Sequence, residues 1–170
     1  MSETAAAIYR EGDDTRLLRD AFGCFATGVT VVTTTTPDDE PVGLTVNSFS
    51  SVSLDPPLLL VCPAKAAGTT ELLENADSFA VNVLGSGAKA TSTRFARKGA
   101  DRFGSEDWST SKLGLPVLAG ALAVFECRRH ALHEGGDHRI LVGRIVHASY
   151  HTEDDPLLYY RGEYRGIHIE

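Results

Sequence analysis

The sequence predicts a single, mainly β domain in which antiparallel strands form a closed or partly closed barrel with a few helices. Three observations support this fold class. A chain of 170 residues fits one domain that can bury a core. Six or seven segments have the β-branched or alternating pattern of strands, and hairpin-type turns separate them. No Gly-x-Gly-x-x-Gly motif follows a strand, so a parallel Rossmann sheet has no support.

The chain is expected to begin with a tail and an amphipathic helix. Residues 1–13 show no apolar period and are predicted to form a mobile tail, which leaves 14–170 as the folded domain. Asp14 can cap a helix whose apolar side chains recur at helical spacing as far as Phe25. Gly28 is predicted to end this helix, because glycine adopts the backbone conformation that helix ends require.

The strands are predicted from β-branched runs and from side chains that alternate between apolar and polar. The segments with this pattern are 29–36, 42–49, 58–62, 78–84, 121–133, 140–150 and a closing pair at 157–160 and 164–169. Proline and aspartate at 37–41 predict one turn, and Glu-Gly-Gly-Asp at 134–137 predicts a second hairpin.

Two short helices and one irregular segment complete the prediction. Residues 69–75 begin with threonine and carry Glu71 in the first turn, where a negative charge favours a helix. Residues 88–97 are the second candidate. Glycine, serine, tryptophan and proline interrupt 103–116, which is therefore expected to be an irregular excursion.

Composition excludes several classes of function. A formal net charge of −7 argues against nucleic-acid binding, which needs clustered lysine and arginine. No apolar run approaches the roughly 20 residues that cross a bilayer, and the acidic N-terminus does not resemble a secretory signal. Cys24, Cys62 and Cys127 match neither a disulfide framework nor a metal motif, so we expect no metal and a cytoplasmic location.

The most informative segment runs from Thr45 to Ser53 and carries five hydroxyl groups and one amide in nine residues. Short hydroxyl side chains let a ligand approach the backbone and donate to phosphate oxygens without bulk. The segment therefore suits a planar ligand with a phosphate tail, although a serine-rich strand edge with turn chemistry has the same composition. In an extended strand neighbouring side chains point to opposite faces, so backbone N–H groups must supply part of the site.

This segment and its flanks resemble the short-chain flavin reductase family, the small reductases of two-component flavin-dependent monooxygenases. The matching pieces occur in the family's order and cover roughly residues 17–166. They are 22–33, 43–57, 58–62, 79–84, 94–96, 101–103, 136–138, 143–144 and 156–162. The resemblance implies a split β-barrel, an antiparallel Greek-key flavin-binding fold, and a homodimer with flavin near the subunit interface.

The resemblance also implies the cofactors and the site. The cofactor would be FMN or FAD, with NADH or NADPH as co-substrate, and a monooxygenase would receive the reduced flavin. His138 is the predicted catalytic residue, near the nicotinamide or flavin, unless it merely belongs to a hairpin turn. The predicted cofactor-binding residues are Thr45, Val46, Asn47, Ser48, Ser50, Ser51, Cys62, Ala64, Lys65, Arg94, Phe95, Ala96, Asp137, Arg161 and Tyr164.

Three alternatives remain open at this point. A pyridoxamine-phosphate-oxidase-like flavin oxidase would display more arginine and lysine for a substrate phosphate. A flavin-binding electron carrier without turnover would use much the same binding residues. A serine hydrolase built on Ser48 or Ser51 with His138 lacks the Gly-x-Ser-x-Gly elbow.

Overall fold

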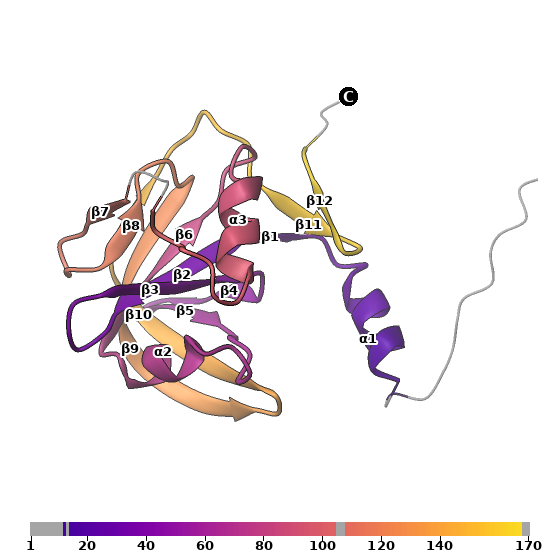
Figure 1. Cartoon of the computed structure of the whole chain (residues 1–170), viewed down its shortest axis with the longest axis horizontal. Helices are drawn as coiled ribbons and strands as arrows, with labels where there is room; N and C mark the ends of the chain where they lie inside the picture. Colours follow the sequence, from indigo (N-terminus) through magenta and orange to yellow (C-terminus); the bar gives the residue numbers. More distant parts are fainter. Residues whose placement is uncertain (1–11, 13, 105–107, 168–170) are drawn as a thin grey trace, which may run out of the picture.

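A computed structural model describes Gly12, residues 14–104 and residues 108–167. The predicted tail, 1–13, lies outside these residues apart from Gly12. The described chain folds around one seven-stranded antiparallel sheet (Figure 1). In sheet order its strands are β3 (Pro41–Val46), β2 (Thr30–Thr35), β6 (Ser78–Val83), β9 (Ala123–Gly135), β10 (His138–Tyr150), β5 (Pro57–Val61) and β4 (Phe49–Leu54).

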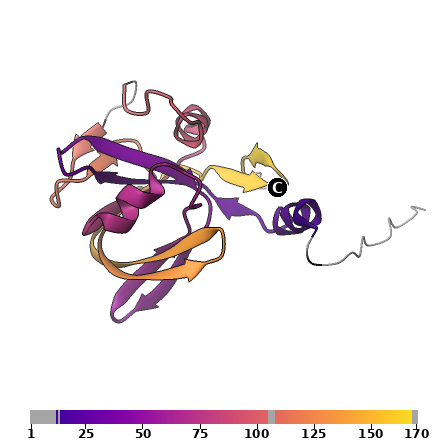
Figure 2. The same ribbon diagram turned by 60° about the horizontal axis from the view of Figure 1, so that its bottom comes forward.

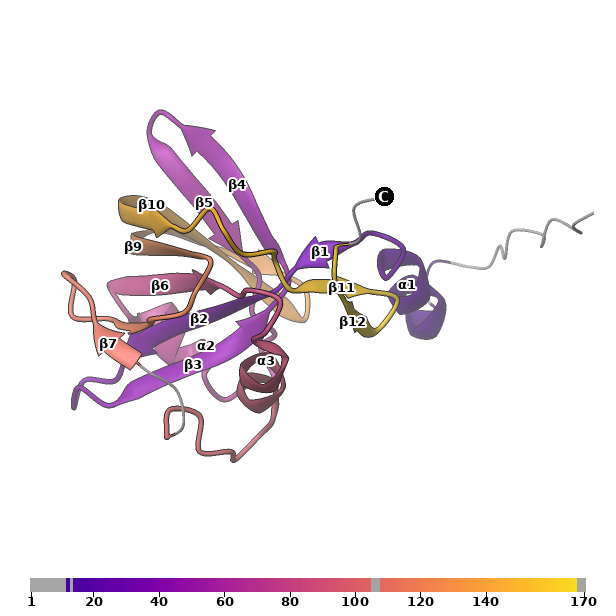
Figure 3. The same cartoon turned by 90° about the horizontal axis from the view of Figure 1, so that it is seen from above.

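The sheet curls because its two edge strands are consecutive in the chain. Only Asn47 and Ser48 separate the end of β3 from the start of β4. Three Cα–Cα steps span at most roughly 11 Å, so the two edges must approach each other at this point. Figure 3 shows the β2–β3 and β4–β5 hairpins diverging from there. The result is a barrel that is joined at one end and split at the other, as the sequence predicts.

Two smaller sheets and three helices flank the barrel. β1 (Thr27–Gly28), β11 (Leu158–Tyr160) and β12 (Glu163–Arg165) form one sheet, and β7 (Trp108–Thr110) and β8 (Pro116–Leu118) form the other. The helices are α1 (Thr15–Phe22), α2 (Thr70–Asn75) and α3 (Lys89–Ala96). α1 stands beside the three-stranded sheet and away from the barrel (Figure 2).

The core fills the barrel and the space beneath α3. One cluster joins buried side chains of β2, β3, β5, β6 and β10, among them Val32, Val61 and Phe79. Gly143 of β10 is required there, because an added Cβ would lie 2.5 Å from the Phe79 ring. The second cluster packs Phe95 of α3 beside Val31 and Leu84.

The first helix is shorter than the sequence predicts. Asp14 caps it as expected, and its carboxylate accepts hydrogen bonds from the N–H groups of Arg16 and Leu17, both at 3.0 Å. The helix ends at Phe22, however, and the prediction that Gly28 ends it is wrong. Gly28 belongs to β1 because the backbone there pairs with β11, a contact that helical periodicity cannot reveal.

The predicted strand 42–49 is in fact interrupted. β3 ends at Val46, and Phe49 already begins β4, a strand that the sequence did not indicate. The break lies at Ser48, whose side chain hydrogen-bonds to the backbone of Cys62. At this position the Ser48 hydroxyl, and not its backbone, makes the hydrogen bonds to Cys62. The alternation of side chains expected for a continuous strand 42–49 therefore stops at Ser48.

Two further boundaries differ from the prediction. The 103–116 excursion contains β7 and the start of β8, because β7 pairs with β8 and the side chains of Asn82 and Thr33 bind the backbone of β8. The Asn82 side chain accepts from the N–H of Leu118 at 2.9 Å, and the Thr33 hydroxyl donates to the carbonyl of Pro116 at 2.6 Å. The 134–137 turn is tighter than expected and consists of Gly136 and Asp137, with φ +71° at Gly136.

Candidate functional site

The link between the barrel's edge strands is the first part of the site. The Ser48 hydroxyl donates to the carbonyl of Cys62 and accepts from its N–H, both at 3.0 Å. This pair clamps the β3–β4 link to the residue that follows β5. Asn47, Ser50 and Ser51 are exposed around the clamp. Ser48 therefore shapes the link, while its three neighbours present an amide and two hydroxyls to solvent.

The loop after β5 also contacts the turn between β9 and β10. Ala64 pairs with His138 in an isolated antiparallel bridge. The N–H of Lys65 donates to the carbonyl of Asp137 at 2.9 Å, and the N–H of Arg139 donates to the carbonyl of Pro63 at 3.0 Å. Through this loop the structure brings together Cys62, Ala64, Lys65, Asp137 and His138, which the sequence places in two segments more than 70 residues apart.

Asp137 and His138 form a polar pair at the tip of the hairpin. The Nδ1 atom of His138 lies 2.7 Å from a carboxylate oxygen of Asp137. This hydrogen bond, and secondarily the charge of the imidazole, lowers the pKa of Asp137 below its ordinary value of 3.8. An Nδ1 atom engaged with a carboxylate leaves Nε2 for another partner. The His138 side chain is 43% exposed, so a ligand can reach it.

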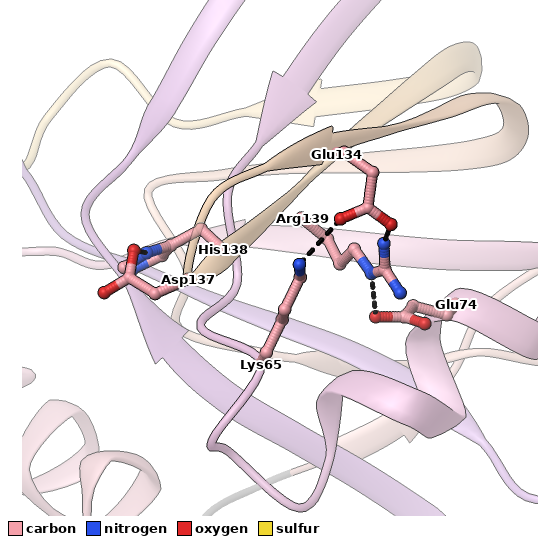
Figure 4. Close-up of polar contacts among 6 residues, drawn as sticks. All are labelled: Lys65, Glu74, Glu134, Asp137, His138 and Arg139. Carbon is pink, nitrogen blue, oxygen red and sulfur yellow. Dashed lines mark hydrogen bonds and ion pairs between the residues drawn. The ribbon is translucent and has the colours of Figure 1, made fainter.

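An ion-pair network lies beside this turn (Figure 4). Glu134 receives the Lys65 ammonium at 2.6 Å on one carboxylate oxygen and the Arg139 guanidinium on the other. Arg139 also donates to Glu74 of α2 at 2.8 Å. Glu74, Glu134 and Arg139 are not among the site residues predicted from the sequence. The sequence does contain a signal for the Glu134–Arg139 pair. The two opposite charges flank the predicted hairpin turn and face each other in the register of β9 and β10.

A second group of predicted residues is centred on α3. The Thr45 hydroxyl donates to the carbonyl of Ser92 at 2.6 Å, and the Ser92 hydroxyl lies 2.9 Å from that of Tyr164. These contacts join β3, α3 and β12. This α3 group is connected to the β3–β4 link through the chain, because Thr45 belongs to the α3 group and Asn47, two residues later, belongs to the link.

The remaining predicted residues differ in how much they can offer a ligand. Phe95 is 1% exposed and packs against Phe103 and Trp108, so within one chain it has a packing role. Val46 is also buried, and its carbonyl accepts from the Thr30 hydroxyl. Arg94 is half-buried, Ala96 is exposed, and the exposed Arg161 lies over the Tyr160 ring at 5.2 Å.

The donor set around the β3–β4 link fits a phosphorylated flavin. Exposed hydroxyl and amide groups suit the polar edge and ribityl chain of such a cofactor, and the Lys65 ammonium suits its phosphate. Within the described ranges, no group of three or more His, Cys, Asp or Glu side chains could hold a metal ion. In the same part of the chain, no helix has the length and apolarity to cross a membrane. Barrel and donor set together define a split-barrel protein with a flavin-type site.

The family follows from comparison with known proteins. A family model described as "Flavin reductase like domain" matches residues 22–168. The chain belongs to this family. The FMN reductase (NADH) SmoA of Agrobacterium fabrum is 48% identical over 153 residues, which cover 90% of this chain and 86% of the relative. The reductase subunit HsaB of a Rhodococcus jostii flavin-dependent monooxygenase is 42% identical over 98% of this chain and 86% of the relative.

Solved structures agree with this assignment. The NADH:FAD oxidoreductase SgcE6 of Streptomyces globisporus superimposes with a TM-score of 0.92 at 40% identity, and the match covers 97% of this chain and 99% of that one. A second structure of SgcE6, in complex with NAD and FAD fragments, gives a TM-score of 0.89 at 41% identity over 94% and 96% of the two chains. The split-barrel prediction and the family resemblance are thereby confirmed.

Proposed function

We propose that this chain is an NAD(P)H-dependent flavin reductase that reduces FMN or FAD and supplies reduced flavin to a partner monooxygenase. Family membership over residues 22–168 and relatives named as such reductases support the activity. The structural observation that supports it most directly is the loop 62–65, which contacts Ser48 of the hydroxyl-rich link through Cys62 and His138 of the Gly-Asp-His turn through Ala64. One loop thus connects the Gly-Asp-His turn with the hydroxyl-rich β3–β4 link, although the two motifs are distant in sequence. Hydride transfer between a nicotinamide and a flavin would require the two cofactors to bind next to each other.

The roles of individual residues follow from their contacts. Asn47, Ser50 and Ser51, with nearby backbone N–H groups, would hold the polar parts of the flavin, and Lys65 would contact its phosphate. A bound flavin supplies the hydride acceptor, so the protein contributes position more than chemistry. His138 is oriented by Asp137 through Nδ1, and its Nε2 atom would be available to hydrogen-bond the nicotinamide or to stabilise negative charge on the flavin. Ser48 keeps the link in place through Cys62.

The assembly is a homodimer in this proposal. α1 has no buried residue; its last residue, Phe22, is 72% exposed, and Phe25, three residues beyond the helix, is 77% exposed. A second copy that covered them would remove a large apolar surface from water. A cytoplasmic location is part of the same proposal, because an exposed free thiol such as Cys24 is typical of a reducing compartment.

Steady-state oxidation of NADH and NADPH with FMN, FAD and riboflavin tests the activity. We expect flavin-dependent loss of the reduced-nicotinamide absorbance far above the uncatalysed rate for at least one pair. A purified protein that binds flavin but oxidises neither nicotinamide would be an electron carrier and would contradict the proposal. Consumption of pyridoxamine phosphate instead would assign the chain to the oxidase class.

A further inference from the structure

The Lys65–Glu134 ion pair has a consequence for ligand choice. Lys65 is the cation that the flavin-type site offers to a phosphate, yet its ammonium lies 2.6 Å from the Glu134 carboxylate. Figure 4 shows the lysine reaching from its loop to the hairpin strand that carries Glu134. Any phosphate that binds Lys65 must therefore compete with an internal anion.

The Lys65–Glu134 ion pair is weak enough for another anion to replace Glu134. The two side chains are 37% and 68% exposed, and ion pairs at such exposure are weak because water and salt screen them. Glu134 also shares its carboxylate with Arg139. Arg139 has a second anion in Glu74, whereas Glu134 is the one ion-pair partner that the described part of the chain gives Lys65. Lys65 is thus the cation of the network that can leave at the least cost.

The loop that carries Lys65 is attached to both parts of the candidate site. Its N–H is held by the carbonyl of Asp137, and Cys62, three residues earlier, is clamped by Ser48. The backbone of the loop is fixed at both points, so only the flexible side chain has to move. A lysine stem has enough rotatable bonds to swing between two anions without loop rearrangement.

We propose that Glu134 is a specificity-determining residue that holds Lys65 until a phosphate-bearing flavin displaces it. This inference rests on the proposed function, because it assumes that flavin binds beside Lys65. A phosphate can contact Lys65 only when it displaces the Glu134 carboxylate. Glu134 neutralises Lys65 in the empty site, which lowers the affinity for other anions, and it sets how strongly FMN is preferred over riboflavin, which lacks the phosphate.

The test is equilibrium binding of FMN and of riboflavin, followed by quenching of flavin fluorescence. Glu134→Gln removes the competing charge and should tighten FMN binding about two- to fivefold, the range expected for an exposed ion pair. Riboflavin affinity should not change. Lys65→Gln should weaken FMN binding about tenfold and also leave riboflavin unchanged. The double variant should match Lys65→Gln, because Glu134 acts only through Lys65.

Glu40→Gln is the matched control. It makes the same substitution and the same change of net charge, but Glu40 lies in the β2–β3 turn, at the opposite end of β3 from Thr45. We expect it to alter neither affinity. Equal changes for both flavins in Glu134→Gln, or a tightening that persists without Lys65, would overturn the inference. Should Glu134→Gln fail to fold, an unchanged FMN affinity in Lys65→Gln overturns it equally. A wild-type chain that binds neither flavin would overturn the proposed function as well.

Discussion

His138 is the residue on which the chemistry of the proposed reaction depends most. Replacing it with alanine should lower turnover roughly ten- to a thousandfold, the scale at which one positioned polar group contributes to catalysis. Flavin affinity should change much less, because the groups that hold the flavin lie on the β3–β4 link. Steady-state kinetics with each nicotinamide, combined with a flavin titration, checks this.

Two comparisons separate this role from a turn residue. His130→Ala removes an exposed histidine from β9 and should leave the kinetics unchanged. In His138→Ala the pKa of Asp137 should rise toward its ordinary value of 3.8, since the two largest causes of its lowering are the hydrogen bond to His138 and the charge of that imidazole. Carbon-detected NMR of the carboxylate measures that shift. Wild-type kinetics together with the risen pKa would confine His138 to the hairpin.

Ser50 tests the hydroxyl-rich link itself. It is exposed at the start of β4, and its hydroxyl donates to the carbonyl of the neighbouring Ser51 at 3.0 Å. Ser50→Leu should weaken flavin binding by about 1–3 kcal/mol, through steric blocking and the loss of a hydrogen bond. Fluorescence quenching measures the affinity. Ser109→Leu, an exposed serine of β7, is the control, and equal effects of the two variants would move the flavin elsewhere.

At the scale of elements, Asn82 decides how the excursion after α3 rests on the sheet. Its side chain is fully buried, donates to the carbonyl of Val31 at 3.1 Å and accepts from the N–H of Leu118. Asn82→Ala should lower the free energy of unfolding by about 1–3 kcal/mol for each buried group left without a partner. Urea denaturation checks this against Asn75→Ala, an exposed asparagine at the end of α2. Equal losses in the two variants would deny Asn82 this role.

Which elements the sequence could predict depends on how local their causes are. The Asp14 cap, α2, and the β2–β3 and β9–β10 hairpins follow from neighbours in the chain, and the structure contains all of them, although β3 ends at Val46 and the β9–β10 turn is shorter than predicted. β4 and the two strands of the excursion were not predicted. Ser48, just before β4, binds Cys62, which lies 14 residues away. The backbone of β8, which pairs with β7, is held by Asn82 and Thr33, 36 and 83 residues away. Contacts at that separation leave no periodic pattern in a single sequence.

At the scale of the molecule, the exposed end of α1 predicts the oligomeric state. Wild-type protein should have twice the chain mass in light scattering at micromolar concentration. Phe22→Glu should shift it toward the monomer, because a charge at an apolar contact loses hydration without gaining a partner. Leu54→Glu, at the exposed β4–β5 turn, is the comparison. A fully active wild-type monomer would contradict the dimer proposal.

The stability of the whole fold should fall at alkaline pH because of Cys127. Burial, and secondarily the charge of Glu126, raises the pKa of this thiol from 9.0 to about 12. Between these values the unfolded chain releases a proton that the folded chain keeps. The free energy of unfolding should therefore drop with rising pH above about pH 9, by at most about 1.4 kcal/mol per pH unit from this group.

Urea denaturation at pH 8 and at about pH 10.5 measures this dependence. Cys127→Ala should flatten the slope, whereas Cys24→Ala, an exposed thiol, should not. A thiol reagent gives a second readout, since Cys24 should react in the native protein and Cys127 only after unfolding. An unchanged slope in Cys127→Ala would assign the alkaline loss to other groups.

The sequence by itself determined the antiparallel barrel, through periodicity and turn chemistry, which are properties of neighbouring residues. Its ordered motifs showed the family resemblance, which implied the split-barrel fold and the two segments that carry the candidate site. Only the tertiary structure decided that Ser48 clamps Cys62 while Asn47, Ser50 and Ser51 remain exposed. The tertiary structure alone also decided that the Glu134 carboxylate pairs with the Lys65 ammonium. Both arrangements arise when the sheet curls and brings distant loops together, and the register of that closure is set by packing across the barrel, which no local pattern encodes.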